Sequence, residues 1–124
     1  MRFIVALAFA LTTSAHASPV IHTSCATELA EHERTLHDEL ARSLAGTDAQ
    51  LDASLVSITE TLAGTDIEVR AEVRALVSDA SGAIRWQSTA HATVRGALPG
   101  RLQLRRDAVI EATHALAAAI RKRL

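Results

Sequence analysis

The chain has 124 residues and a formal net charge of −1, and 48% of its residues are hydrophobic while only 2% are aromatic. Phe3 and Phe9 are its only phenylalanines and it has no tyrosine, so Trp86 is the sole aromatic residue after position 9. Proteins that bind single-stranded nucleic acid stack the bases on aromatic side chains, and this composition therefore argues against a nucleic-acid partner and against a site that stacks sugars.

The first 17 residues have the order of a secretory signal peptide. Arg2 precedes an unbroken apolar run, Phe3–Leu11, and Ala15-His16-Ala17 is a small-x-small cleavage site. Nine apolar residues are too few to cross a bilayer, which takes about 20, and no later stretch is longer. A buried N-terminal helix or strand is the alternative. We therefore expect cleavage after Ala17 and a periplasmic or secreted single domain over residues 18–124, with no transmembrane segment.

The next segment predicts a short lead-in strand over residues 18–23 and then a helix over residues 25–45. Ser24 is a suitable N-cap, and Gly46 is a typical residue just beyond a helix C-terminus. The apolar residues of this helix fall at steps of seven, four and four and so form one stripe: Leu29, Leu36, Leu40 and Leu44.

Three strands are predicted in the middle of the chain. Residues 50–62 change parity near Leu55 and Val56, which indicates a β-bulge. Residues 67–77 alternate strictly between apolar and charged, which is typical of a strand with one buried and one solvated face. A turn at 79–82 leads into the third strand, residues 83–95, where Trp86 is the bulkiest candidate for the core.

A last helix is predicted over residues 101–123, with a stripe of six apolar residues: Leu102, Val109, Ala112, Leu116, Ala119 and Ile120. Because one sheet face is polar, both helices are expected to cover the other face. The sequence thus predicts an α+β two-layer sandwich. In it a three-stranded antiparallel meander, with room for a fourth N-terminal strand, lies under an N-terminal and a C-terminal helix.

Charge is divided unevenly along the chain. Residues 18–66 contain nine acidic and two basic side chains, whereas residues 67–124 contain five acidic and ten basic ones. Four arginines lie around the Gly-Ala-Leu-Pro-Gly segment at 96–100: Arg95, Arg101, Arg105 and Arg106. The guanidinium fork suits phosphate and carboxylate groups, so these residues predict an anion- or partner-binding surface, with a solvated basic rim as the alternative.

A cluster of histidines and acids in the first helix raises the question of a metal site. Glu28 and His32 are four residues apart, as are Glu33 and His37, and either pair could hold a metal ion. His22 could add a third ligand. His32 and His37 are five apart, so the zinc motif HExxH is not formed. A solvated helix face with i,i+4 pairs is the alternative, and no cofactor is expected.

Cys25 is the only cysteine, so no intramolecular disulfide can form. A thiol tucked against the core, a reactive thiol near the start of a helix, and a disulfide-linked dimer are all compatible with its position. Ser, His and Asp are present without a catalytic motif such as GxSxG, and the protein is expected not to be an enzyme.

Two features resemble a group of small bacterial envelope proteins. They are the strand-turn-strand VRALVSDASGAIRW at 73–86 and the terminal Arg/Ala/Leu-rich helix that closes on Arg123-Leu124. The chain resembles the lipopolysaccharide-assembly lipoproteins and the auxiliary lipoproteins of envelope lipid-transport ABC systems. Those families carry a lipid anchor on a cysteine directly after the signal peptide, and Cys25 does not hold that place. The resemblance implies a non-catalytic accessory role and transfers no residue role.

Three hypotheses follow for the function. The first is a non-enzymatic exported accessory domain of the bacterial cell envelope that binds an envelope protein or an anionic lipid or glycolipid. The second is a small periplasmic metal-binding protein that uses the His and Glu residues of the first helix. The third is a structural homodimer joined through an exposed strand edge or through Cys25.

Overall fold

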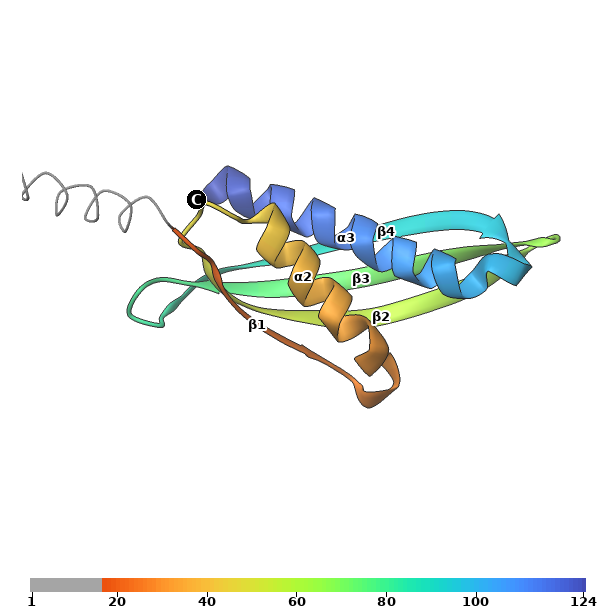
Figure 1. The fold of residues 1–124 in the computed structure, drawn as a ribbon, viewed down its shortest axis with the longest axis horizontal. Coiled ribbons are helices and arrows are strands. Elements are labelled where there is room, and N and C mark those ends of the chain that lie inside the picture. Colours follow the sequence, from red (N-terminus) through yellow and green to blue (C-terminus); the bar gives the residue numbers. More distant parts are fainter. Residues whose placement is uncertain (1–16) are drawn as a thin grey trace, which may run out of the picture.

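The computed structural model describes residues 17–124 as a mixed α+β fold (Figure 1). The predicted signal segment thus lies outside the described residues, apart from Ala17. In chain order the elements are β1 (Val20–Cys25), the 3₁₀ helix η1 (Thr27–His32), α2 (Glu33–Ser43), β2 (Gln50–Ala63), β3 (Asp66–Ser78), β4 (Ile84–Ala97), the 3₁₀ turn η2 (Leu98–Gly100) and α3 (Arg101–Arg123). The three central strands and the last helix confirm their predictions to within two residues.

The N-terminal part differs from its prediction at the helix start. Ser24 and Cys25 belong to β1, where they pair with Ser54 and Leu55 of β2, so Ser24 does not cap a helix. The segment predicted as one helix over 25–45 divides into η1 and α2. Sheet pairing outweighs the capping preference of Ser24, because each paired residue satisfies backbone groups that a short helix end leaves open.

The four strands form one sheet in the order β1-β2-β3-β4. The predicted fourth strand is therefore present. β1 runs parallel to β2, while β2, β3 and β4 form an antiparallel meander. The register of β2 on β3 shifts between Leu55 and Ser57, which confirms the predicted bulge and leaves Val56 partly exposed on the strand.

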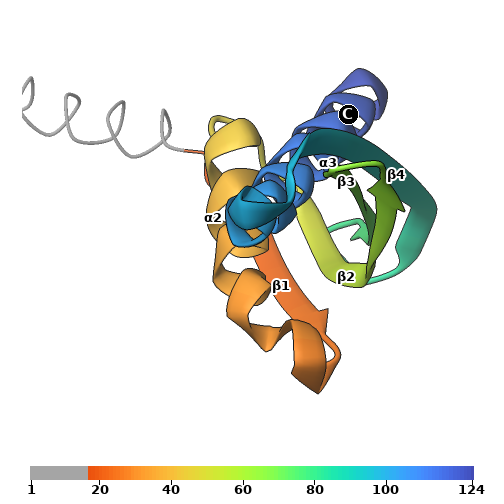
Figure 2. The ribbon, with the colours of Figure 1, turned by 90° about the vertical axis from the view of Figure 1, so that its right-hand side faces the viewer.

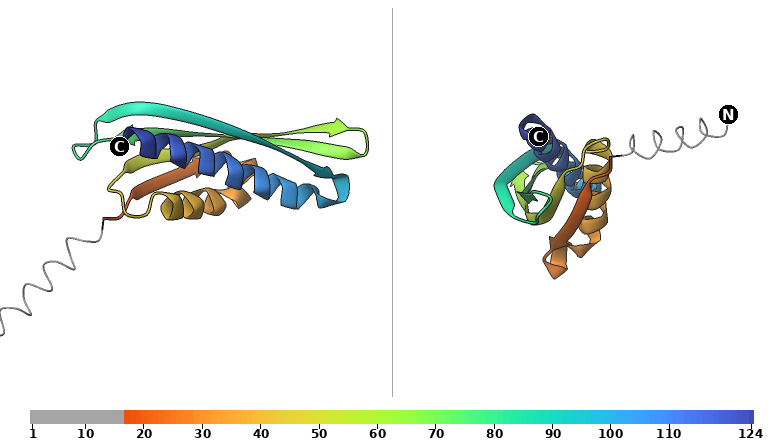
Figure 3. Two further views of the ribbon diagram at one scale, coloured as in Figure 1. Left: turned by 90° about the horizontal axis from the view of Figure 1, so that it is seen from above. Right: turned by 90° about the vertical axis from the view of Figure 1, so that its left-hand side faces the viewer.

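Both helices cover one face of the sheet, as the alternation of residues predicts. α3 packs mainly over β3 and β4, and α2 lies beside α3 and over β1. Figures 2 and 3 show the sheet curling around α3 so that the strands and helices enclose one layer. The core of that layer consists of the inward residues of β2 and β3 and the two helix stripes, and its largest fully buried side chains include Leu36, Leu40, Leu44, Leu116 and Ile120.

Some predicted core residues are not fully buried. Trp86 is only partly buried, like the other inward residues of the edge strand β4. Ile84 has the strand parity of Trp86, but the register of β3 on β4 shifts between Val77 and Ser78, and Ile84 is 63% exposed. Leu102 of the last helical stripe is 72% exposed, whereas Leu104 in the same turn packs against the core.

The two helices are joined at one end by an arginine rather than by apolar contact alone. The guanidinium group of Arg121 donates hydrogen bonds of 2.8 Å to the carbonyl oxygens of Ser43 and Ala45, where α2 ends. Halfway along, the imidazole Nε2 of His114 lies 3.0 Å from the carboxylate of Glu39. Carbonyls at a helix C-terminus lack intrahelical donors and carry partial negative charge. Arg121 therefore stabilises the C-terminus of α2 by donating to these carbonyls, and its own charge is also favoured at the C-terminal end of α3.

Candidate functional site

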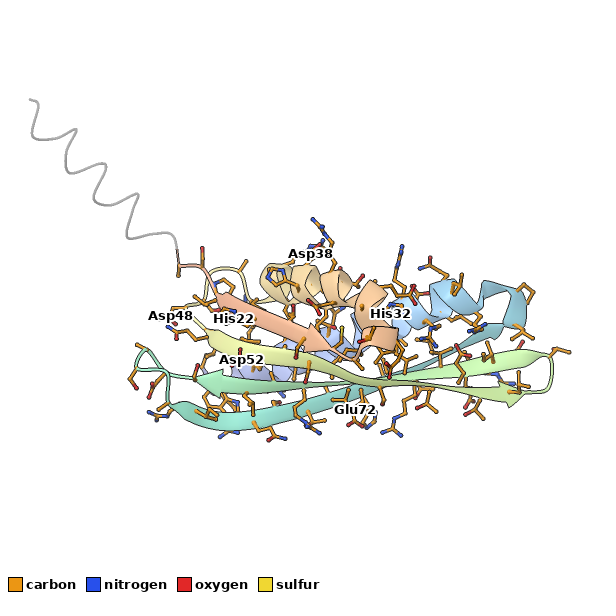
Figure 4. The ribbon with its side chains drawn as sticks, turned by 90° about the horizontal axis from the view of Figure 1, so that it is seen from below. His22, His32, Asp38, Asp48, Asp52 and Glu72 are labelled. Carbon is orange, nitrogen blue, oxygen red and sulfur yellow. The ribbon has the colours of Figure 1, made fainter. Side chains whose placement is uncertain are left out.

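The four residues predicted as metal ligands lie on separate elements. His22 is on β1 and faces solvent, Glu28 is exposed on η1, His32 is buried at the end of η1, and His37 is exposed on α2. Figure 4 shows His22 on the strand and His32 beyond the end of that strand. Within residues 17–124, no three His, Cys, Asp or Glu side chains come together as a metal site requires.

His37 lines an open hollow of about 570 Å³ between β1 and α2. Its imidazole Nδ1 lies 3.5 Å from a carboxylate oxygen of Asp38, and the hollow is completed by Thr23, Ala30, Glu33 and Arg34. Arg34 also lies 3.8 Å from Asp38. These contacts match the alternative that the sequence left open, a solvated helix face with local charge pairs.

His32 is the one buried residue of the predicted metal set. Its side chain is 9% exposed, and its Nε2 lies 3.4 Å from a carboxylate oxygen of Glu31 without making a hydrogen bond. Burial lowers the pKa of His32 from its ordinary 6.5, and the nearby Arg105 and Arg106 lower it further, while the Glu31 carboxylate opposes them. The neutral imidazole is therefore the form that the fold favours.

This pKa shift predicts acid-sensitive stability. The unfolded chain binds a proton at His32 more readily than the folded chain does, so stability falls as the pH drops below about 6.5 toward the lower folded pKa. Above that window the contribution is constant. We expect the free energy of unfolding, measured by urea denaturation, to fall between pH 8 and pH 5, and to fall less in His32→Gln.

Glu60 provides the matched comparison for this prediction. Its pKa is lowered by hydrogen bonds from Arg101 and Arg105, so the stability that it contributes is lost only as the pH falls below its ordinary value of 4.5. Glu60→Gln should therefore leave the change between pH 8 and pH 5 as it is in the wild type. An identical change in the wild type and in His32→Gln would contradict the assignment to His32.

The predicted arginine surface is largely neutralised by acids from the sheet. Arg101 Nε and an Nη of Arg105 lie 2.9 and 2.8 Å from the same carboxylate oxygen of Glu60 on β2. Arg95 lies 3.3 Å from Asp66 and 3.7 Å from Glu68. Of the four arginines, only Arg106 has no carboxylate within ion-pair distance in the described part of the chain. The Arg101–Arg105–Glu60 contacts tie the start of α3 to β2.

Exposed leucines gather at the same end of the fold. Leu62 of β2 is 69% exposed, Leu98 of η2 is 45% exposed, and Leu102 of α3 is 72% exposed. Leu62 pairs with Ile67, which pairs with Gly96, and the Arg101–Glu60 bond places the first turn of α3 beside β2. We call these three residues the leucine end. Figure 1 shows the β2–β3 turn and the start of α3 together at this end.

A second hollow, of about 340 Å³, lies at the other end of the fold. Trp86, Val77 and Ala49 are among its apolar lining residues, and Arg85 and Arg123 are among its polar ones. Together with Asp48, Gln50, Ser78, Asp79, Ala80 and Leu124 they make up what we call the tryptophan hollow.

Trp86 is held in this hollow by a cation–π contact. The guanidinium carbon of Arg123 lies 4.7 Å from the centre of the indole ring. The indole Nε1 is buried and has no hydrogen-bond partner among the described residues, which is unusual for a buried donor. The rim is ordered, because the carboxylate of Asp79 accepts hydrogen bonds from Ser81 and from the backbone of Ala83.

The face of the sheet away from the helices is polar, as the alternation predicts. Cross-strand neighbours on this face include Glu68 with Arg95 and Glu72 with His91. In Figure 4, which views this side, His22, Asp52 and Glu72 lie on three neighbouring strands. Pairs of opposite charge across antiparallel strands stabilise a sheet by about 0.2–1 kcal/mol each, which accounts for the Glu68–Arg95 pair without a ligand.

Cys25 is a partly buried thiol that faces α2. Its Sγ lies 3.5 Å from the carbonyl oxygen of Leu29 and 3.4 Å from a carboxylate oxygen of Glu33. Burial raises the pKa of this thiol, and the Glu33 carboxylate raises it further. The thiolate is the reactive form of cysteine, so the environment of Cys25 favours the unreactive form.

The leucine end is the feature that sequence reasoning missed. Leu62 and Leu102 were assigned to a strand and to a core stripe, and Glu60 was not singled out at all. A signal was available for Leu62, because it stands next to the turn at Ala63–Asp66, where a strand has few neighbours left to cover it. No pattern in the sequence pointed to Glu60 as the partner of two arginines more than 40 residues away.

The fold is shared with solved structures of bacterial proteins, among them lipoproteins. A minor lipoprotein from Acinetobacter baumannii superposes with a TM-score of 0.56 at 12% identity, over 86% of this chain and 94% of the other. A candidate lipoprotein from Caulobacter crescentus gives 0.55 at 17% identity, over 83% and 86%. PelC from Paraburkholderia phytofirmans, solved as a dodecamer, gives 0.53 at 17% identity, over 83% and 87%.

These likenesses confirm the resemblance in fold to small envelope lipoproteins that the sequence suggested, and at such low identity they show the fold alone. No protein-family model matches the chain, and no curated protein matches it in sequence. None of the described helices is long and apolar enough to cross a membrane.

Proposed function

We propose that this chain is a non-enzymatic accessory domain of the bacterial cell envelope, exported by a leader that is cleaved after Ala17, and that it acts by binding another protein through the leucine end. The domain would comprise residues 18–124. Its fold is one that bacterial lipoproteins use, which supports a place in the envelope.

The observation that carries the proposal is the exposure of Leu62, Leu98 and Leu102 at one end of the fold. Exposed apolar side chains that gather within a polar rim are typical of interaction sites. Full burial of a leucine side chain in a contact contributes about 1.5–3 kcal/mol to its free energy, whereas an exposed ion pair contributes about 0–1 kcal/mol. The leucines therefore supply most of the binding energy, and the arginines around them serve as the polar rim.

The charge at this end favours a protein partner over an anionic lipid. Four arginines were expected to attract phosphate groups, but three of them are engaged by the carboxylates of Glu60, Asp66 and Glu68. A basic residue near an anionic membrane contributes about 1 kcal/mol only while its charge is available. A protein surface that offers apolar side chains within a polar rim fits the leucine end better.

A second copy of the chain is the partner that the observations favour. One structure of the same fold was solved as a dodecamer, which supports self-association. β1 and β4 are the edges of the sheet, and exposed strand edges and uncovered apolar ends both promote contact between copies. Self-association is the broader form of the homodimer that the sequence left open.

The export part of the proposal is tested by expressing the full chain in a Gram-negative bacterium and fractionating the cells. The expected result is a periplasmic product whose intact mass corresponds to residues 18–124. A product that keeps Met1–Ala17 and stays in the cytoplasm would overturn the assignment of the leader.

The binding part is tested with Leu62→Ser/Leu102→Ser. In native gels of envelope extracts, the wild-type chain should migrate in a complex, and this variant should migrate as a monomer. Val56→Ser, which replaces an exposed valine on the other sheet face, is the matched control and should migrate like the wild type. Complexes that survive the leucine substitutions would exclude the leucine end as the binding surface.

Binding to lipid vesicles tests the alternative that the leucine end contacts an anionic lipid surface. The purified mature chain is sedimented with phosphatidylglycerol vesicles and with phosphatidylcholine vesicles, and it should stay in the supernatant with both. Binding to phosphatidylglycerol vesicles that is lost in Leu62→Ser/Leu102→Ser would replace the protein partner by an anionic lipid surface.

A further inference from the structure

The two uncovered apolar regions lie at opposite ends of the fold. The leucine end lies at the β2–β3 turn, and the tryptophan hollow lies at the β3–β4 turn beside the end of α3. Figures 1 and 3 show these two turns at opposite ends of the long strands. One region projects exposed side chains and the other is hollow, so they are complementary in shape and not copies of each other.

The hollow is large enough for the leucines. A closed cavity of about 150 Å³ accommodates benzene, which has six carbons, and a leucine side chain has four. The tryptophan hollow measures about 340 Å³, so it has room for more than one leucine side chain. Part of its lining is apolar, formed by Trp86, Val77 and Ala49, and Ile84 is exposed next to it, whereas the rim carries charged side chains.

The charges at the two ends permit close approach. At the tryptophan hollow, Arg85 lies 3.6 Å from Asp79, and Arg123 lies over the indole ring. Asp48 at the rim is in no ion pair among the residues that the structure describes. At the leucine end the arginines outnumber their carboxylate partners by one, Arg106. In the lining of the hollow Arg85 and Arg123 balance Asp48 and Asp79, so the hollow does not repel the positive charge left over at the leucine end, and the carboxylate of Asp48 remains available to pair with it.

We infer that copies of this chain associate head to tail, with the leucine end of one copy seated in the tryptophan hollow of the next. This inference rests on the self-association proposed above and names the surfaces that carry it. Because the two surfaces lie at opposite ends of the long strands, an end-on contact leaves each of the two copies with one free surface. The contact is heterologous, and repeated it closes into a ring or continues as an open filament.

The inference is tested with two variants that each disable one surface. Leu62→Ser/Leu102→Ser removes the exposed leucines. Ala80→Arg places a long charged side chain at the lining of the hollow, on an exposed turn residue whose replacement should not disturb folding. Circular dichroism and thermal midpoints confirm that both variants fold. Val56→Ser and Thr59→Arg, both at exposed positions of the outer sheet face, are the matched controls.

The measurement is the molar mass by light scattering of the purified mature chain, in reducing buffer so that Cys25 cannot link copies. The wild type and both controls should form oligomers larger than a dimer. Each disabled variant alone should be monomeric, since losing a buried leucine weakens a contact by roughly tenfold or more. An equimolar mixture of the two variants should form a dimer and nothing larger, because only one intact leucine end meets one intact hollow.

The possible outcomes distinguish the head-to-tail contact from self-association in general. If the wild type forms oligomers that neither variant disturbs, the head-to-tail contact is wrong while self-association stands. If the mixture of the two variants stays monomeric although each surface is needed, the two surfaces do not bind each other. If the wild type is monomeric throughout, both the inference and self-association fail.

Discussion

Leu36→Ala is expected to lower the free energy of unfolding by about 2–5 kcal/mol. Leu36 lies on α2, is fully buried, and belongs to the core shared by the sheet and both helices. Removing three carbons from such a position loses their transfer free energy and leaves a cavity that rigid neighbours fill only in part. The stability of a whole fold of this size is about 5–15 kcal/mol, so this single change should remove a large part of it.

The measurement is urea unfolding at neutral pH, followed by circular dichroism. Leu102→Ala is the matched control, at a protein concentration at which the copies are dissociated, because it makes the same chemical change in a helix at a position that is 72% exposed in the single chain. That control should change the free energy of unfolding by no more than about 0.5 kcal/mol. If both variants lost the same stability, the distinction between a buried α2 stripe and an uncovered leucine end would be wrong.

Ala112→Leu is expected to destabilise the fold by about 1–3 kcal/mol, although leucine is as good a helix former as most residues. Ala112 lies on α3, is fully buried, and faces the sheet, where Ala71 and Ala75 of β3 are also fully buried. Small residues on both sides let α3 approach the strands closely. A larger side chain there must push the helix outward or adopt a strained rotamer.

Ala118→Leu makes the same substitution on the same helix at an exposed position, and it should be nearly neutral in the same unfolding experiment. The pair isolates packing from helix propensity, since the propensity change is equal at both sites. A stabilising effect of Ala112→Leu would show that the layer between α3 and the sheet contains space that its residues do not fill.

The candidate site was predictable only in part. The four arginines around residues 96–100 were expected to meet an anion, and the anion that Arg101 and Arg105 meet is Glu60 of the same chain. The sequence shows that an arginine needs a partner, but it does not show which distant carboxylate the fold brings near. The predicted metal ligands were separated because the helix predicted over residues 25–45 divides, which places Glu28 and His32 on η1 and His37 on α2.

The apolar periodicity of the sequence also did not predict which residues are buried at the ends of helices and strands. Leu102 keeps the helical spacing of Val109 and Leu116, and Ile84 keeps the strand parity of Trp86, yet both are exposed. Periodicity shows which face of an element is apolar. It does not show how far the neighbouring element reaches to cover that face, and a register shift of one residue is enough to turn a strand end outward.

The sequence by itself determined the layered α+β fold, because strict alternation over β3 and regular leucine steps on α2 leave only one way to bury the apolar faces together. It also determined the bulge in β2, since the change of parity at Leu55 and Val56 requires an extra residue. The tertiary structure alone decided that Ser24 and Cys25 extend β1, that Glu60 neutralises two arginines, and that the leucine end and the tryptophan hollow stay uncovered. These features depend on where separate elements stop and meet, and that is set by the packing of the whole chain.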